Sequence, residues 1–197
     1  MSTRALLLVD LQPTFCEGGA LPTVGADAVA RKAARYAAEH RSDYAAVVTT
    51  QDWHIDPGDH FSDTPDFVDS WPPHGVAGTA EAELHPALAG QTFDASVKKG
   101  QYAAAYSGFE GVDEDGRPLA NILRERGIDA VDVVGLVESH CVKETALDAQ
   151  RLGLRTRVLT DLTIPVSPEL GAQARAEMSA AGVELAESVS PGAGRAG

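Results

Sequence analysis

The sequence is poor in cysteine, in basic side chains and in long apolar runs. Its two cysteines, Cys16 and Cys141, are too few and too far apart for the disulfide framework of a small secreted domain, which predicts a reducing, cytoplasmic location. No apolar stretch reaches the length that spans a bilayer, and the first apolar run is too short for a signal peptide. We therefore expect an unexported protein with no membrane partner.

Basic residues number 16 against 29 acidic residues, which gives a formal net charge of −13. Because nucleic acids and anionic membranes are bound mainly through Lys and Arg, this balance argues against both as partners. At 197 residues the chain is long enough to bury about 70% of its unfolded surface in one domain. We expect a single domain over residues 1–189 and a disordered Gly-, Pro- and Ser-containing tail over residues 190–197.

Short apolar runs alternate along the chain with segments of helical periodicity. Strands are predicted at residues 4–9, 44–50, 92–98, 130–134, 155–160 and 183–188, and helices at residues 27–40, 118–126, 142–152 and 168–180. This alternation predicts an α/β fold with three layers, α/β/α, around a six-stranded, mainly parallel sheet. Residues 53–91 have much turn chemistry and little periodicity, and a loop of that length is usually functional.

Four chemically active side chains fall at or just after the carboxyl ends of predicted strands. They are Asp10, Asp52, Lys99 and Cys141. Because ligands of open parallel sheets bind beyond these strand ends, the four side chains are expected to converge on one edge. Taken singly, Asp10 could cap a turn, Lys99 could be a solvated surface lysine, and Cys141 could be a small buried hydrophobic residue.

Cys141 is predicted to lie between a strand and a helix, in the first turn of that helix. Unpaired backbone N–H groups and the positive end of the helix dipole favour a thiolate there, which makes Cys141 a candidate nucleophile. In a shared pocket Asp10 could accept the thiol proton, while a cationic Lys99 would stabilise the negative charge held by the pair.

A second cluster combines a carboxylate with imidazoles at the start of the long loop. Its members are Asp52, His54, His60 and His74. Such a set suits one borderline divalent ion, Zn²⁺, Fe²⁺ or Mn²⁺. The alternative is that these histidines lie in solvated turns beside Pro and Gly. Against it, four of the six histidines, His85 included, fall between positions 54 and 85.

Several stretches resemble those of one known family in order and spacing. They are VDLQ with Asp10, TQDWHIDPGDHF, SWPPH, VKKG with Lys99, AAYSGFEGVDEDG, and GLVESHCVKETALDA with Cys141. From residue 4 to residue 189 the sequence resembles the nicotinamidases, also called pyrazinamidases, of the cysteine hydrolase superfamily that includes the isochorismatases. The resemblance implies the isochorismatase-like hydrolase fold and hydrolysis of nicotinamide to nicotinate and ammonia in NAD salvage, with pyrazinamide as a further substrate.

The resemblance also implies roles for the first cluster. Asp10, Lys99 and Cys141 would form a catalytic triad, in which Cys141 forms a thioester and Asp10 moves the protons. The backbone N–H groups of Val137 and Cys141 would form the oxyanion hole, beside a cis peptide bond at Leu136-Val137.

A metal site and a ring pocket are implied in the same way. The metal ligands would be Asp52, His54 and His74, with His60 as the extra ligand found in some members. The ring pocket would be lined by Phe15, Trp71, Tyr106 and His140. The metal would bind the ring nitrogen of a small amide substrate and so place its carboxamide over Cys141.

Alternatives to this function stay open. The protein could be another amidase of the superfamily, because Val137, Ser139 and Pro13-Thr14 depart from the family's usual residues near the expected pocket. It could also be a metallohydrolase in which the ion activates water and Cys141 is structural. A non-enzymatic binding protein is the third alternative, although a degenerate copy would be expected to lose part of the triad. We expect a monomer or a small homo-oligomer.

Overall fold

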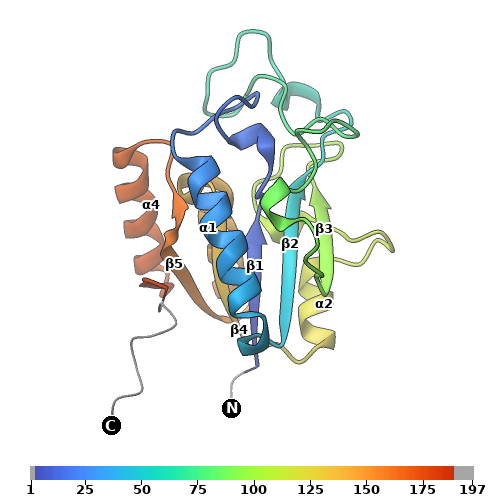
Figure 1. The fold of residues 1–197 in the computed structure, drawn as a ribbon. Helices are drawn as coiled ribbons and strands as arrows, with labels where there is room; N and C mark the ends of the chain where they lie inside the picture. Colours follow the sequence, from blue (N-terminus) through green and yellow to red (C-terminus); the bar gives the residue numbers. More distant parts are fainter. Residues whose placement is uncertain (1–2, 189–197) are drawn as a thin grey trace.

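A six-stranded parallel sheet runs through residues 3–188, the part of the chain that the computed structural model describes (Figure 1). The strands are β1 (Arg4–Val9), β2 (Ala46–Asp52), β3 (Ala95–Lys99), β4 (Ala130–Leu136), β5 (Arg155–Ile164) and β6 (Glu184–Ala186). The α-helices are α1 (Ala26–Glu39), α2 (Leu119–Glu125), α3 (Lys143–Arg151) and α4 (Pro168–Ala180). Short 3₁₀ turns are η1 (Pro13–Phe15), η2 (Arg41–Asp43), η3 (Gly58–His60), η4 (Pro86–Leu88) and η5 (Gly108–Glu110), and η6 (Glu138–Val142) is a π-helical turn.

The two central strands of the sheet, β1 and β4, mark the point where the strand order reverses. The order is β3-β2-β1-β4-β5-β6, so the chain builds one half of the sheet outward from β1 and the other outward from β4. In such sheets the crevice beyond the carboxyl ends at the switch point binds ligands. The ends of both strands are level, since Val9 pairs with Gly135. Asp10 and turn η6 therefore both lie at this crevice.

Apolar layers cover both faces of the sheet. α1 packs on one face through small side chains, which are Ala26, Ala30, Ala33, Ala34 and Ala37. The buried side chains of α2, α3 and α4 pack on the other face. Every residue of β2 and of β4 is buried, as expected for central strands covered on both faces, although β2 ends in the polar residues Thr49, Thr50, Gln51 and Asp52 and β4 contains Asp132. The predicted three-layer α/β/α architecture is confirmed.

The predicted strands and helices are present, with shifted ends. β2 ends at Asp52 and β3 ends at Lys99, so both side chains belong to strands rather than to the residues that follow them. Cys141 lies in the π-helical turn η6 rather than in the first turn of an α-helix, and α3 begins at Lys143. The predicted tail, residues 190–197, lies outside the described residues, and the division into one domain and a tail stays a prediction.

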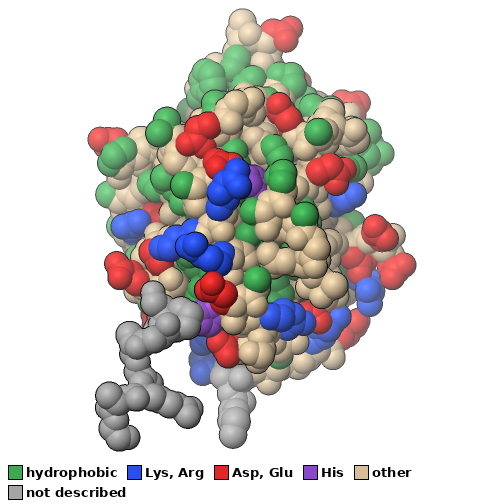
Figure 2. Space-filling view, in the orientation of Figure 1, with side chains coloured by type: hydrophobic (Ala, Val, Ile, Leu, Met, Phe, Trp, Pro, Cys, Tyr) green, Lys and Arg blue, Asp and Glu red, His purple; other side chains and the backbone are tan. Residues whose placement is uncertain are grey.

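On the side seen in Figure 2, acidic side chains are scattered, while hydrophobic side chains gather at the upper end, where the loop after β2 lies in Figure 1. Phe67 and Val68 of this loop are exposed. None of the described helices combines the length and the apolar character needed to cross a membrane.

Candidate active site

The four side chains at the strand ends lie in one buried cluster. Asp10, Asp52 and Lys99 are at most 3% exposed, and Cys141 is 7% exposed. Lys99 Nζ lies 2.9 Å from Asp10 Oδ2 and 3.6 Å from Cys141 Sγ. The same ammonium donates to Asp52 Oδ1. The parallel strands thus bring two carboxylates, an ammonium group and a thiol together, although β1, β3 and η6 are far apart in the sequence.

Asp10 is held by its backbone and by Thr50. Its φ of 46° lies in the left-handed region, which non-glycine residues rarely adopt and which is found where surrounding structure enforces it. Thr50 Oγ1 donates to Asp10 Oδ1 at 2.5 Å and accepts from Asp10 N at 3.2 Å. One carboxylate oxygen is therefore committed to Thr50 and the other faces Lys99. Sequence reasoning missed Thr50, because a β-branched residue in a buried strand is typical of the core.

The charges of the cluster depend on its burial. Burial raises the pKa of Cys141 well above its usual value, and the charge of Lys99 offsets only part of that rise. Burial likewise raises the pKa of Asp10. For Lys99 burial alone would lower the pKa, but Asp10 and Asp52 raise it well above the usual value. Desolvation of the buried thiol thus opposes the thiolate that the sequence predicts from the helix dipole, and the charge of Lys99 opposes that desolvation.

The end of β4, which leads into the turn that carries Cys141, comes very close to β1. A Cβ at Gly135 would lie 2.0 Å from Val9 O, so a glycine is required for this approach. The peptide bond Leu136-Val137 is cis, as the family resemblance implies. Thr145 Oγ1 donates to the carbonyl oxygen of Cys141 at 2.6 Å, which ties the turn to α3. These contacts place the thiol at the crevice beyond β1 and β4.

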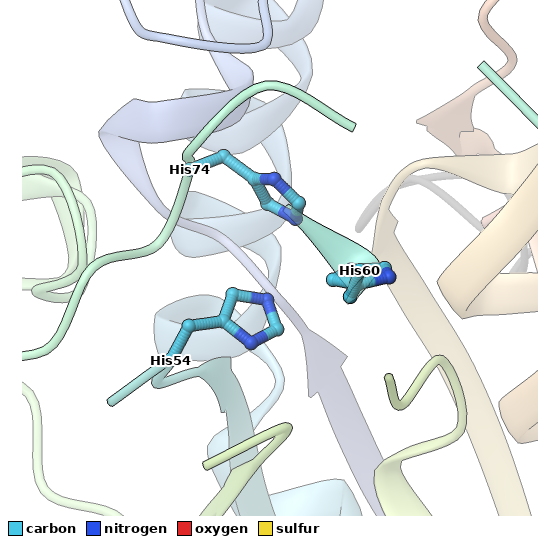
Figure 3. A group of neighbouring side chains, drawn as sticks. All are labelled: His54, His60 and His74. Carbon is cyan, nitrogen blue, oxygen red and sulfur yellow. The ribbon is translucent and has the colours of Figure 1, made fainter. Parts of the chain in front are cut away.

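Asp52 links this cluster to the histidines. Its Oδ2 lies 3.8 Å from His54 Nε2 and 3.7 Å from His74 Nε2, while Oδ1 pairs with Lys99. Candidate ligand atoms of His54, His60 and His74 lie within 4.8 Å of one another. Figure 3 shows the three imidazoles around a common space.

The hydrogen bonds of the imidazoles fit a metal site. His54 Nδ1 lies 2.6 Å from Gly100 O and His74 Nδ1 lies 2.8 Å from Pro72 O, so each Nδ1–H donates to a carbonyl and leaves a lone pair on Nε2. Within the described part of the chain, the buried atoms His54 Nε2 and His60 Nδ1 have no hydrogen-bond partner. A buried polar atom without a partner costs free energy, and coordination of a metal ion would remove that cost.

The protonation states of the histidines also suit metal binding. Burial lowers the pKa of His74 to about 4, and it also lowers the pKa of His60. Both imidazoles are therefore neutral at neutral pH, the form that binds a metal ion. With Asp52 they make a carboxylate and imidazole set suited to a divalent ion.

His85 does not belong to the histidine cluster. Its Nε2 donates to Asp27 Oδ1 at 3.0 Å and its Nδ1 accepts from Ala87 N at 3.1 Å. The ring is buried and fastens the loop to α1. Counting histidines along the sequence thus grouped one structural histidine with the other three.

One cavity of about 780 Å³ joins the thiol, three of the four candidate metal ligands and the aromatic side chains, while His54 is not part of its lining. Its lining includes Asp52, His60, His74, Val137, Cys141, Phe15, Trp71, Tyr106 and His140. Trp71 Nε1 donates to Tyr106 Oη at 2.9 Å, and the Trp71 and His140 rings meet edge to face with centroids 5.5 Å apart. An aromatic wall with a few polar groups at its base suits a flat ring that bears a small polar substituent.

Comparisons with known proteins agree with this geometry. The sequence-family model described as the isochorismatase domain matches residues 4–189 of this chain. The nicotinamidase/pyrazinamidase of Mycobacterium tuberculosis is 57% identical over 182 residues, which cover 92% of this chain and 97% of that protein. The nicotinamidase of Escherichia coli is 38% identical over 207 residues, covering 94% and 95%. The crystal structure of the pyrazinamidase of Pyrococcus horikoshii in complex with zinc superposes with a TM-score of 0.80 at 33% identity, covering 94% and 99%.

Proposed function

Because the chain belongs to the isochorismatase family, we propose that it is a nicotinamidase, a hydrolase that converts nicotinamide and water to nicotinate and ammonia. Pyrazinamide, which also combines a ring nitrogen with a carboxamide, is a second substrate. One observation carries the proposal. The Cys141 thiol, with Lys99 Nζ at 3.6 Å, opens into the same cavity as the His60 and His74 imidazoles. That cavity offers both a nucleophile for an amide and a site for a ring nitrogen.

The first half of the reaction forms a thioester. Cys141 Sγ attacks the carboxamide carbon while its proton passes to Asp10, and the carbonyl electron pair moves onto oxygen. The backbone N–H groups of Val137 and Cys141 stabilise this oxyanion. As the carbon–nitrogen bond breaks, Asp10 returns the proton to the departing nitrogen, which leaves as ammonia. Lys99 holds the Asp10 carboxylate in place and balances the negative charge of the thiolate.

The second half hydrolyses the thioester. Asp10 takes a proton from a water molecule, whose oxygen attacks the acyl carbon. The carbon–sulfur bond then breaks, the proton on Asp10 returns to Cys141 Sγ, and the product leaves as the carboxylic acid, which loses its remaining proton to water to give nicotinate. Burial of the cluster suits both halves, because a carboxyl group with a raised pKa releases and regains a proton more readily near neutral pH.

One divalent ion would be held by Asp52, His54, His60 and His74, whose nitrogen and oxygen donors suit Zn²⁺, Fe²⁺ or Mn²⁺. Such an ion would supply a positive centre for the pyridine nitrogen and would thereby orient the carboxamide. Phe15, Trp71, Tyr106 and His140 line the space for the ring. A cytoplasmic location and a monomeric or small homo-oligomeric state stay predictions from the sequence.

Ammonia release tests the proposal. We would compare wild-type protein loaded with metal, the same protein after chelation, and a metal-loaded Cys141→Ala variant, each with nicotinamide. Turnover by wild type and loss of turnover in Cys141→Ala would support the thiol mechanism. Retained activity in Cys141→Ala combined with loss on chelation would instead establish a metallohydrolase. No release by wild type from nicotinamide or pyrazinamide would overturn the proposed substrate class.

A further inference from the structure

The turn that carries the nucleophile contains a fully buried carboxylate. Glu138, three residues before Cys141, is 0% exposed. Arg175 of α4 reaches it with two parallel hydrogen bonds, from Nε to Oε1 at 2.6 Å and from Nη2 to Oε2 at 3.0 Å. Such bidentate pairing fixes both distance and direction. A buried carboxylate without its partner is strongly unfavourable, so the pair holds η6 and α4 at a defined separation.

Two further contacts join the same turn, and the first residue of α3 directly after it, to α4 and to the segment that leads into α4. Ser139 Oγ accepts from Val166 N at 3.2 Å. Lys143 Nζ donates to Glu177 Oε2 at 2.9 Å. The three contacts lie on both sides of Cys141 in the sequence, and of the two ion pairs only Glu138–Arg175 contains a fully buried carboxylate. The nucleophile turn is thus anchored by α4 and by the segment directly before it.

Glu138 is covalently next to Val137, whose backbone N–H the proposed mechanism uses. We propose that Arg175 is a positioning residue for the reaction. Through Glu138 it holds the backbone N–H groups of Val137 and Cys141 in the geometry that stabilises the oxyanion. This inference rests on the proposed function, because an oxyanion forms only if Cys141 attacks a carbonyl carbon. Arg175 itself lies outside the lining of the active-site cavity.

Two ligands separate this role from general stability. Pyridine-3-carbaldehyde accepts the Cys141 thiol at its carbonyl carbon, with the thiol proton ending on the former carbonyl oxygen, so its adduct needs the positioned turn. Nicotinate fills the ring pocket without that addition. The variants are Arg175→Met, Arg175→Lys and Glu138→Gln. Arg41→Met is the matched control, because Arg41 is 43% exposed against 46% for Arg175 and pairs with Asp94 at 2.7 Å, away from the turn.

With metal-loaded protein, Arg175→Met is expected to lower kcat for nicotinamide about 10- to 100-fold with little change in KM. The affinity for the aldehyde should fall by a similar factor while that for nicotinate stays within about twofold, and Arg175→Lys should recover part of the loss. If Arg175→Met does not fold, Glu138→Gln, which keeps the shape and removes the charge, carries the same expectation.

Equal weakening of both ligands, or a fall in melting temperature with kcat and aldehyde affinity unchanged, would overturn the positioning role. So would an Arg41→Met variant that lost kcat to the same extent. A wild-type protein that neither hydrolyses nicotinamide nor binds either ligand would overturn the proposed function and this inference with it. Wild-type turnover with normal aldehyde binding by every Arg175 variant would leave the proposed function standing and remove the inference alone.

Discussion

Lys99 donates to Asp52 Oδ1, and this single ion pair joins the nucleophile cluster to the candidate metal site. The other oxygen of the same carboxylate lies 3.7 Å from His74 Nε2. Burial alone would raise the pKa of Asp52, but the charge of Lys99 together with His54 lowers it below its usual value. The Asp52 carboxylate is therefore ionised and contacts both sites, so we expect a substitution in one site to affect the other.

Asp52→Asn should damage both sites. We expect the apparent metal affinity to fall at least about 10- to 100-fold, and kcat to stay low even at saturating metal, because a neutral amide no longer balances Lys99. His60→Ala should lower metal affinity while excess metal restores most of kcat. The measurement is kcat against free metal concentration for both variants. Full recovery of Asp52→Asn by excess metal would show that the two sites are independent.

The two adjacent lysines should behave differently. Lys99→Met is expected to lower kcat about 100- to 1000-fold, because the charge developed on Cys141 and Asp10 loses its buried counter-charge. Lys98→Met is the matched control, since the Lys98 ammonium lies 3.5 Å from the centroid of the Trp53 ring instead of in the cluster. Its kcat should stay within about threefold of wild type. Steady-state kinetics of both variants check this, and equal losses would contradict the assignment to Lys99.

The sequence predicted the sheet and the convergence of the site for one physical reason. In parallel α/β sheets the carboxyl ends of all strands meet at one edge, so Asp10, Asp52 and Lys99 could be grouped from strand ends alone. The sequence could not predict which side chains contact each other across the fold. Thr50 on Asp10 and Arg175 on Glu138 are long-range contacts, and neither partner carries a local signal. The raised pKa of Cys141 likewise depends on burial, which local sequence does not specify.

Cys16 should be an inert thiol at moderate pH. Burial, together with the charges of Asp27 and Glu17, raises its pKa to about 11. Because the thiolate is the reactive form, only about one molecule in a thousand would be reactive at pH 8. In a Cys141→Ala background, iodoacetamide should label Cys16 slowly at pH 8 and faster as the pH approaches 11. Labelling rates by mass spectrometry check this against the unfolded protein. Rapid labelling of native protein at pH 8 would contradict the raised pKa.

Metal should stabilise the folded protein through three of the four histidines of the loop. An ion that binds the native state and is present at 100 times its dissociation constant adds about 2.7 kcal/mol to the free energy of unfolding. For a chain of this size the melting temperature should rise about 5 to 10 °C, and chelation should reverse the rise. His54→Ala should abolish most of the shift, because it removes a buried Nε2 that faces Asp52. His85→Ala is the control, since its ring binds Asp27 and Ala87. That variant should melt earlier than wild type in the absence of metal and still show the full rise. Equal loss of the rise in both variants would place the ion elsewhere.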